Sequence, residues 1–524
     1  MSAALSVTTM EPADTVDESR GERFPVLTVI SHPDLTRIGD CAFLTHLHQS
    51  RALEISRAVT DFAPPGKVIG KPLGDSYLSR KPFLLRLGGH GEIRLEKKQC
   101  ASYIGADGLE VIETTTFPAE SLERGVVLNL AKRIVLLLHM AAQRRTLPLD
   151  HGLVGNSDCI HDLRHEIEKV ADLKTPILLR GPSGSGKELV ARAVHRAGGR
   201  NRPFIAVNMG AIPQHLAASE LFGALKGSFT GADRHQLGFF RAAAGGTLFL
   251  DEIGEASLEV QVALLRALES GEITPVGAQK PVPVKTRLIA ATDADLETKM
   301  EEDSFKAPLF HRLAGYEITV PSLRQRREDL GRLLMHFARG EFANLGSRLP
   351  SVAEGKPWLP AKLVEALLFF AWPGNVRQLA NVVRQLVIGC RGEPVLRLVP
   401  KVASILADPP EPDGEATSDE VKQRKPSQIP REELRQALRD NAWGLKATAL
   451  QLGISRGALY QIIDRTPGLQ KAKDLGAEEI RAVLRESKGD VEVAAERFQV
   501  SLRALRRRIT DLGIDPLGGE EVHG

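Results

Sequence analysis

Seven consecutive residues of this chain have the types and spacing needed to hold a phosphate group: Gly181, Pro182, Ser183, Gly184, Ser185, Gly186 and Lys187. They follow an apolar stretch, 177–179, that predicts a strand, and precede 188–196, which has the pattern of a helix. Glycines let backbone amides surround a phosphate, a helix start adds partial positive charge, and the lysine reaches the outer phosphates. We therefore expect ATP to bind here, and a glycine-rich turn without a ligand is the weaker alternative. The next residue is Glu188, where the general pattern has Ser or Thr to contact magnesium.

A second predicted strand, 247–250, ends in the acidic pair Asp251 and Glu252. Asp251 is placed to hold the shell of a Mg²⁺ ion, and Glu252 to orient or deprotonate an attacking water. Alone, such a pair is as often a solvated strand end. Together with the phosphate loop it predicts nucleotide hydrolysis.

The elements that must position these groups change in kind along the chain. Residues 26–140 contain short apolar runs, such as 26–30 and 126–130, separated by turns, which predicts an all-β sandwich. From Leu153 onward, β-branched runs alternate with amphipathic segments, as in a parallel α/β sheet. We place a domain boundary near 145. Residues 407–430 are rich in Pro, Asp, Glu and Ser and predict a flexible linker.

Composition sets wider limits. The 524 residues are 42% hydrophobic and 26% charged, which is typical of an ordinary multidomain globular chain. The net charge of +3 is too small to imply nucleic-acid binding by itself. The four cysteines are far apart, which argues against a disulfide framework and a zinc site. Residues 1–20 lack an apolar core, so we expect a cytoplasmic protein without a membrane anchor.

The C-terminal part contains an internal repeat. A shift of 46 residues aligns 432–463 with 478–509 without gaps, and ten of the thirty-two pairs are identical. Roughly two would be expected from composition. Between Lys422 and Asp515 there are nineteen Lys or Arg and thirteen Asp or Glu. This predicts two copies of one helical module in the basic part of the chain.

Residues 150 to about 400 resemble the AAA+ domain of sigma-54-dependent activators, the bacterial enhancer-binding proteins. In that family Glu follows the loop lysine, as Glu188 does here. The segment 227–232, Gly-Ser-Phe-Thr-Gly-Ala, is similar to the family's Gly-Ala-Phe-Thr-Gly-Ala loop. The resemblance implies a homo-oligomeric ring, a hexamer in our expectation, that remodels sigma-54 RNA polymerase through Gly227, Phe229, Thr230 and Gly231. An ordinary glycine turn around a core Phe is the alternative for this segment.

The resemblance also implies roles for three single residues. Asn208 resembles the residue that restrains the catalytic glutamate. Arg377, in the string Trp-Pro-Gly-Asn-Val-Arg at 372–377, is similar to the second sensor, and Arg312 to an arginine finger that reaches the neighbouring subunit. Two positions depart from the family. Lys306 stands where it has a second arginine, and Asp293 stands where its first sensor has Asn.

The N-terminal sandwich more faintly resembles a forkhead-associated domain, a reader of phosphothreonine. The resemblance implies that Arg57, Ser79 and Arg80 contact the phosphate, through charge-assisted hydrogen bonds. Pro82 replaces the family's histidine, and the loop 106–108 lacks its asparagine. A structural domain that has lost phosphopeptide binding therefore stays open as an alternative.

Each C-terminal repeat resembles the helix-turn-helix of the factor-for-inversion-stimulation type. In the first repeat, 447–456 carries the small alanine, the turn glycine and a capping serine. The expected DNA contacts are Arg456 and Gln461 in the first repeat and Arg503, Arg506 and Arg507 in the second. A helical packing or dimerisation domain is the alternative.

Taken together, the sequence predicts a multidomain transcription activator that binds upstream DNA and uses ATP and Mg²⁺. The expected segments are a disordered start (1–25), an FHA-like sandwich (26–140), an α/β ATPase core (150–322), a helical lid (323–400), a linker (401–430) and tandem helix-turn-helix repeats (431–516). A phosphothreonine protein or a kinase is a further expected partner. Two alternatives remain: a DNA-binding AAA+ regulator that has lost sigma-54 remodelling, and a binding module with a relict nucleotide site.

Overall fold

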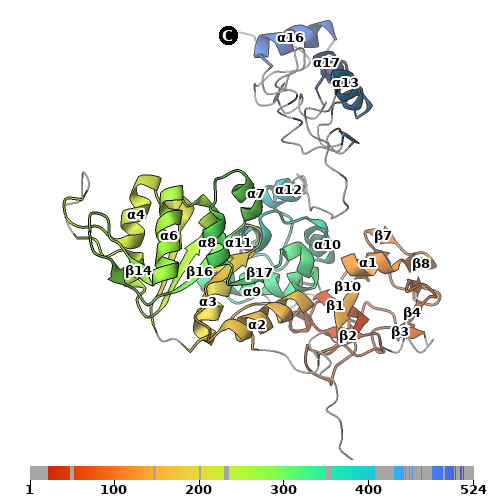
Figure 1. Cartoon of the computed structure of the whole chain (residues 1–524). Helices are drawn as coiled ribbons and strands as arrows, with labels where there is room; N and C mark the ends of the chain where they lie inside the picture. The colour runs from red at the N-terminus through yellow and green to blue at the C-terminus, as the bar shows by residue number, and fades with distance from the viewer. Residues whose placement is uncertain are drawn as a thin grey trace, which may run out of the picture. The chain divides into compact units, whose positions relative to one another are not determined.

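The structure is a computed structural model that forms two compact units, 1–413 and 414–524, which we describe separately (Figure 1). The residues that it describes are 22–45, 47, 52–144, 149–199, 202–228, 235–349, 356–407, 430–441, 443, 448, 451–452, 459, 462, 475–487, 490–500, 502, 505, 508–509 and 512. The expected disordered start 1–25 lies outside these residues up to 21, but a strand already begins at Arg23. Of the expected linker 401–430, residues 408–429 lie outside, whereas 401–407 are helical, because Val402 is buried in the core of the lid. Many residues of the tandem repeats 431–516 also lie outside.

The N-terminal region is β-rich, as predicted, and consists of two antiparallel sheets. One sheet has the order β2-β1-β10-β9-β6-β7 and the other β3-β4-β5-β8. The elements are β1 (Arg23–Ser31), a 3-10 turn η1 (Leu35–Arg37), β2 (Cys41–Phe43), β3 (Leu53–Ile55), β4 (Phe83–Leu87), β5 (Ile93–Glu96), β6 (Ile104–Ala106), β7 (Leu109–Glu110), β8 (Thr114–Phe117), α1 (Ala119–Arg124), β9 (Val126–Leu130) and β10 (Ile134–Ala142). Side chains from both sheets, among them Leu27, Phe83 and Leu136, form one buried core.

The α/β part is built on a parallel sheet of order β12-β13-β16-β11-β17. Its elements are α2 (Asp158–Val170), β11 (Ile177–Arg180), α3 (Lys187–Ala197), β12 (Phe204–Asn208), η3 (Met209–Ala211), α4 (Gln214–Phe222), α5 (Phe239–Ala242), β13 (Thr247–Asp251), η4 (Ile253–Glu255), α6 (Leu258–Ser270), β16 (Arg287–Thr292), α7 (Leu296–Glu301), α8 (Ala307–Leu313) and β17 (Tyr316–Thr319), with a small hairpin of β14 (Glu272–Ile273) and β15 (Val282–Pro283).

Alternation along the strands explains why helices cover both faces of this sheet. Leu178 and Leu250 belong to one buried cluster, and Leu179 and Phe249 to another. Because successive strand residues point to opposite faces, an unbroken apolar strand needs a cover on each side. The carboxyl ends of β11 and β13 lie on the same edge, where the predicted phosphate loop and acidic pair follow.

The lid follows the sheet as a group of helices: η5 (Leu323–Asp329), α9 (Leu330–Asn344), α10 (Ala361–Phe369), α11 (Asn375–Gly389) and α12 (Pro400–Ala407). Helices α9 and α11 pack on each other, and α10 contacts strands β9 and β10 of the N-terminal sandwich. The described elements of the second unit are α13 (Arg431–Asp440), α16 (Ala477–Glu486) and α17 (Val491–Phe498).

The second unit has two small hydrophobic cores that follow the 46-residue repeat. Leu434, Leu438 and Leu459 are buried in the first core. Their equivalents in the second are Ile480, Leu484 and Leu505. The repeat therefore corresponds to a repeated packing unit, because the positions that match in sequence are the positions that are buried.

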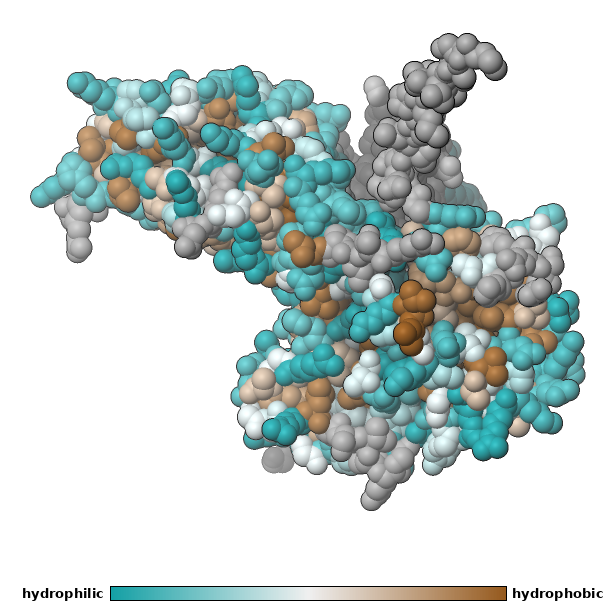
Figure 2. All heavy atoms as spheres, turned by 90° about the horizontal axis from the view of Figure 1, so that it is seen from below, coloured by the Kyte–Doolittle hydropathy of each residue, from teal (hydrophilic) through white to brown (hydrophobic). Residues whose placement is uncertain are grey.

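The surface shows no broad apolar face in the view of Figure 2, where hydrophobic residues occur in small separate groups among hydrophilic ones. Among the described residues, none of the helices has both the length and the apolar character needed to cross a lipid bilayer. All four cysteines are free.

Candidate nucleotide site

The predicted phosphate loop lies between strand β11 and helix α3, in the context that the sequence indicated. Gly181, Gly184 and Gly186 have φ of 156°, 73° and 108°, which L side chains rarely adopt. A Cβ on Gly184 would also collide with the carbonyl oxygen of Gly374 in the lid. The glycines are therefore required both by the turn and by the close approach of the lid.

Lys187 is buried at the start of α3, and its Nζ donates to the carbonyl oxygen of Gly181 at 2.7 Å. Burial lowers the pKa of this ammonium, while the carboxylates of Asp293 and Asp251 act in the opposite direction. Burial raises the pKa of Asp251 at the end of β13, against the hydrogen bond that its Oδ1 accepts from the Glu252 amide at 3.0 Å. The lysine and both acids thus share one electrostatic environment.

Glu252 has a left-handed backbone, with φ 55° and ψ 45°, directly after β13. This conformation costs of order 1–3 kcal/mol for a residue with a side chain, and such strain is common at functional sites. A Cβ on Gly210 would lie 2.5 Å from Glu252 Oε2 and 3.3 Å from Asn208 Oδ1. The structure therefore brings Asn208 and Glu252 to the same place. Asn208 Oδ1 accepts from the Ala211 amide at 3.2 Å and caps η3.

The lid closes onto the phosphate loop through α11. The Arg377 amide donates to the Gly184 carbonyl at 3.2 Å, and its Nη1 lies 3.4 Å from Ser183 Oγ. Asn375 Nδ2 donates to the Ser183 carbonyl at 3.0 Å, and its Oδ1 accepts from Leu323 of η5. We gave Asn375 no role from the sequence, although it lies in the same six-residue string as Arg377. Its left-handed φ of 48° becomes evident only in the structure.

Arg312 is not close to this loop. It lies on α8, and its Nε is 3.6 Å from Glu269 Oε1 of α6, with both side chains about half exposed. Lys306 precedes the same helix, and its amide donates to the buried Gln261 Oε1 at 2.8 Å. Asp293 lines an open hollow beside Gly181 and Pro182. Of the two departures from the family pattern, only Asp293 borders the nucleotide site of its own chain.

The predicted contact loop is described only at its start. Gly227 has φ 80°, and a Cβ at this position would have no neighbouring atom within 4 Å. Ser228 follows it. Phe229, Thr230 and Gly231 lie outside the described residues. The same is true of the predicted DNA contacts Arg456, Gln461, Arg503, Arg506 and Arg507.

The structure brings the three predicted phosphopeptide residues together at one end of the sandwich. The Arg57 amide donates to the Ser79 carbonyl at 3.3 Å, and its Nη1 donates to the Ser76 carbonyl at 3.2 Å. Ser79 Oγ accepts from the Lys81 amide at 3.0 Å. Arg80, which lies between Ser79 and Lys81 in sequence, is exposed. Asp75, four residues before Ser79 in the same loop, forms an ion pair of 3.1 Å with Arg133.

Two family descriptions match the part of the chain that carries this geometry. Residues 153–319 match the Sigma-54 interaction domain, and residues 324–401 match the AAA+ ATPase lid domain. The first match contains the phosphate loop, the acidic pair and Arg312. The second contains Arg377.

Several curated regulators are similar to this chain. The nitric oxide reductase transcription regulator NorR1 of Cupriavidus necator is 39% identical over 344 residues, which are 61% of this chain and 64% of the relative. NtrC of Klebsiella pneumoniae is 44% identical over 258 residues, 48% of this chain and 54% of the relative. A solved structure of NtrX from Brucella abortus with ADP is 31% identical, covers 60% of this chain and 70% of its own, and has a TM-score of 0.43.

The fold and the site thus define an AAA+ ATPase domain with its helical lid. More particularly, residues 153–319 and 324–401 are a sigma-54 activator AAA+ domain and lid, homologous to those of the NtrC, NorR and LuxO regulators. The chain spans between half and two thirds of the length of the two curated relatives named above.

Proposed function

We propose that this chain is a DNA-binding transcription activator that hydrolyses ATP and uses the energy to open promoter complexes of sigma-54 RNA polymerase. One observation carries the proposal: Lys187, the Asp251–Glu252 pair and Arg377 converge on one loop, in the segments that match the sigma-54 interaction domain and its lid. The proposal goes beyond the family match, because binding, hydrolysis and remodelling are separate activities.

The roles of the side chains follow from their positions. Lys187 donates to the carbonyl oxygens of Gly181 and Pro182, and we propose that it exchanges these hydrogen bonds for bonds to the β- and γ-phosphate oxygens when nucleotide binds. Glu252 accepts a proton from the attacking water or orients it, and Asn208 holds Glu252 until the site is complete. Arg377 contacts the nucleotide from the lid.

The residues present suit a Mg²⁺ ion shared with the nucleotide. Asp251 is the oxygen donor that we assign to it, through one carboxylate on the edge of the sheet. Among the described residues, no three or more His, Cys, Asp or Glu side chains are grouped to hold a metal on their own. Proteins usually bind Mg²⁺ through one or two carboxylates plus substrate phosphates, and Asp251 can supply one such carboxylate. When bound, the ion neutralises charge that develops on the transferring phosphoryl group.

The purified chain of 524 residues should therefore hydrolyse ATP in the presence of Mg²⁺. Turnover that depends steeply on protein concentration would support ring assembly, because Arg312 lies away from its own phosphate loop and would act on a neighbouring subunit. Absence of ATP turnover at any concentration would instead favour a binding module with a relict site.

We further propose that the sandwich is FHA-like and binds a phosphothreonine peptide through Arg57, Ser79 and Arg80. The support is that the backbones of Arg57 and Ser79 are hydrogen-bonded and that Arg80, the next residue, is exposed. Arg57→Ala and Ser79→Ala should each weaken peptide binding by about 1.5–3 kcal/mol, the value of a hydrogen bond to a charged group. Calorimetry against a phosphothreonine peptide library measures this. Failure of the parental protein to bind any peptide would favour a purely structural sandwich.

For the C-terminal unit we propose tandem helix-turn-helix repeats, in which the second supplies phosphate contacts and the first reads bases. Arg503→Ala with Arg507→Ala should weaken binding to all DNA sequences and shallow the salt slope by about one to two units. Arg456→Ala with Gln461→Ala should instead relax discrimination between sites. Equal salt slopes for the parent and the arginine variant would exclude the second repeat from the DNA.

A second candidate function is a DNA-binding AAA+ regulator that has lost sigma-54 remodelling. The observation that favours it is Asp293, which borders the nucleotide site and has no donor group to offer the γ-phosphate. Lys306 adds to it, as a point charge without the planar fork of arginine. ATP turnover without promoter opening would identify this second function.

A further inference from the structure

The N-terminal sandwich and the ATPase lid are packed into one hydrophobic cluster. Ile30, Val127 and Val135 of the sandwich are fully buried together with Leu334 and Leu367 of the lid. A tethered sensory domain would make a mostly polar contact with its neighbour. Separating the two parts here would expose apolar side chains of both.

Backbone contacts make the junction close as well as apolar. Helix α9 runs so near strand β1 that a Cβ on Gly331 would collide with the Ile30 carbonyl oxygen. Arg332 of the same helix donates from Nη2 to the Gly39 carbonyl at 2.9 Å. In the opposite direction, Ser31 Oγ at the end of β1 donates to the Leu359 carbonyl at 3.2 Å. These bonds fix the orientation of the lid on the sandwich.

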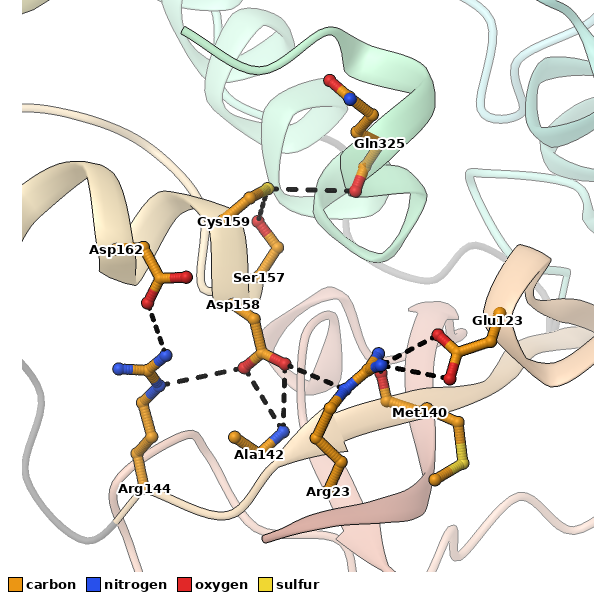
Figure 3. A network of polar contacts seen from close by, with 10 residues as sticks. All are labelled: Arg23, Glu123, Met140, Ala142, Arg144, Ser157, Asp158, Cys159, Asp162 and Gln325. Atoms are coloured by element: carbon orange, nitrogen blue, oxygen red, sulfur yellow. Dashed lines mark hydrogen bonds and ion pairs between the residues drawn. The ribbon is translucent and has the colours of Figure 1, made fainter. Parts of the chain in front are cut away.

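A polar network continues this junction to helix α2, which precedes strand β11 (Figure 3). Arg23 of β1 lies between Glu123 of α1 and Asp158 of α2, with Nη1–Oε2 and Nε–Oδ2 separations of 2.9 and 3.8 Å. Asp158 also accepts from the Ala142 amide at the end of β10. The first turn of α2 is thereby tied to the sandwich.

The short element η5 contacts both the sandwich and the phosphate loop, through the adjacent residues Arg327 and Arg326. Arg327 Nη1 donates to the carbonyls of Arg124 and Gly125 in the sandwich, at 2.6 and 3.0 Å, and its Nη2 donates to Leu368 of α10 at 3.1 Å. Arg326 is buried, and its Nη2 donates to the carbonyl of Ser185 in the phosphate loop at 3.3 Å.

The backbone of η5 is shaped for this double contact. Arg326 has φ −136° and ψ 47°, outside the helical range, so that its side chain leaves η5 in a different direction from a helical neighbour. Asp329, the last residue of η5, is buried and accepts from the amide and the Oγ of Ser157, the N-cap of α2. Buried charges are costly unless well hydrogen-bonded, and here each of them holds a backbone segment.

We propose that Arg327 and Arg326 are positioning residues through which the N-terminal sandwich sets the geometry of the phosphate loop, and hence the affinity for nucleotide. The inference rests on the proposed binding of ATP at this loop. By linkage, nucleotide binding must alter the sandwich side of the junction by the same free energy.

The test measures equilibrium binding of a fluorescent ATP analogue to the full chain. Arg327→Ala should raise the Kd by about fivefold or more, the lower end of ordinary coupling between sites. Arg324→Ala is the matched control, because Arg324 is an exposed arginine of the same element. Arg327→Lys, which restores one donor, should give an intermediate Kd. A purely structural role would lower the melting temperature and leave the Kd of the folded fraction unchanged.

Hydrogen exchange of the unmodified protein gives a second measurement that needs no variant. Adding the ATP analogue should slow amide exchange in β9, next to the carbonyls that Arg327 holds. Equal Kd values for Arg327→Ala and Arg324→Ala, or unchanged exchange in β9 on nucleotide binding, would overturn the inference alone. A parental protein that binds no nucleotide would overturn the proposed function and this inference with it.

Discussion

At the scale of single residues, the site combines buried charges with a strained backbone. Lys187 sits among loop carbonyls, and Glu252 adopts a left-handed conformation that only its surroundings can maintain. The strain aims the Glu252 carboxylate at the place above Gly210 where Asn208 also points. Loss of the Lys187 charge and loss of the Glu252 charge should therefore affect different steps of the reaction.

Glu252→Gln should leave nucleotide binding nearly intact and lower turnover by at least about 10²-fold, because the amide keeps the shape but cannot accept a proton. Lys187→Ala should abolish binding itself. The measurement is the Kd for an ATP analogue beside the rate of phosphate release, with Glu255→Gln, an exposed acid three residues further on, as the control. Parental turnover in Glu252→Gln would show that another group activates the water.

Glu328, at the junction of sandwich and lid, should make stability depend on pH. Burial, with a further contribution from Asp329, raises its pKa to about 8. Between its ordinary pKa and about 8, the folded protein keeps a proton that the unfolded chain has released, so stability falls as pH rises through this range. Glu328→Gln should remove this dependence and raise the melting temperature more at pH 8 than at pH 5. The exposed Glu302→Gln should change neither, and equal gains at both pH values would contradict the assignment.

At the scale of elements, the sequence was most informative where local chemistry sets the structure. The phosphate loop and the acidic pair could be predicted because glycine spacing and strand patterning act over a few residues. The packing of sandwich on lid could not, because Gly331 lies three hundred residues from Ile30 in the chain and reads simply as a glycine in a helix. The carbonyl partners of Arg326 and Arg327 were missed for the same reason: a backbone acceptor leaves no sequence pattern.

Helix α9 offers a matched test of that junction. Gly331→Ala should destabilise the first unit by about 1–3 kcal/mol, because the new methyl group meets the Ile30 carbonyl and the Ile38 side chain. Gly340→Ala, on the same helix with open space around it, should stabilise by about 0.4–1 kcal/mol. Thermal or urea unfolding measures both. Stabilisation by both substitutions would mean that α9 does not rest on strand β1.

At the scale of the whole molecule, the chain combines a sandwich fixed to the lid of an AAA+ domain with a separate unit of two repeated helical cores. In the proposed function, the C-terminal unit binds DNA, the sandwich binds the phosphothreonine peptide, and a ring of ATPase domains hydrolyses ATP to open the promoter complex. In that function, the segment after Gly227 contacts the polymerase, and this segment belongs to the matched sigma-54 interaction domain.

The most direct test of the central claim is formation of open complexes by sigma-54 RNA polymerase at a promoter that the protein binds, in the presence of ATP. The parental protein should open the promoter. Phe229→Ala and Thr230→Ala should each abolish opening while ATP turnover stays largely unchanged, because in the proposed function this loop acts on the polymerase and not on the nucleotide. Opening by the parent that both substitutions leave intact, or ATP turnover by the parent without any opening, would contradict the account.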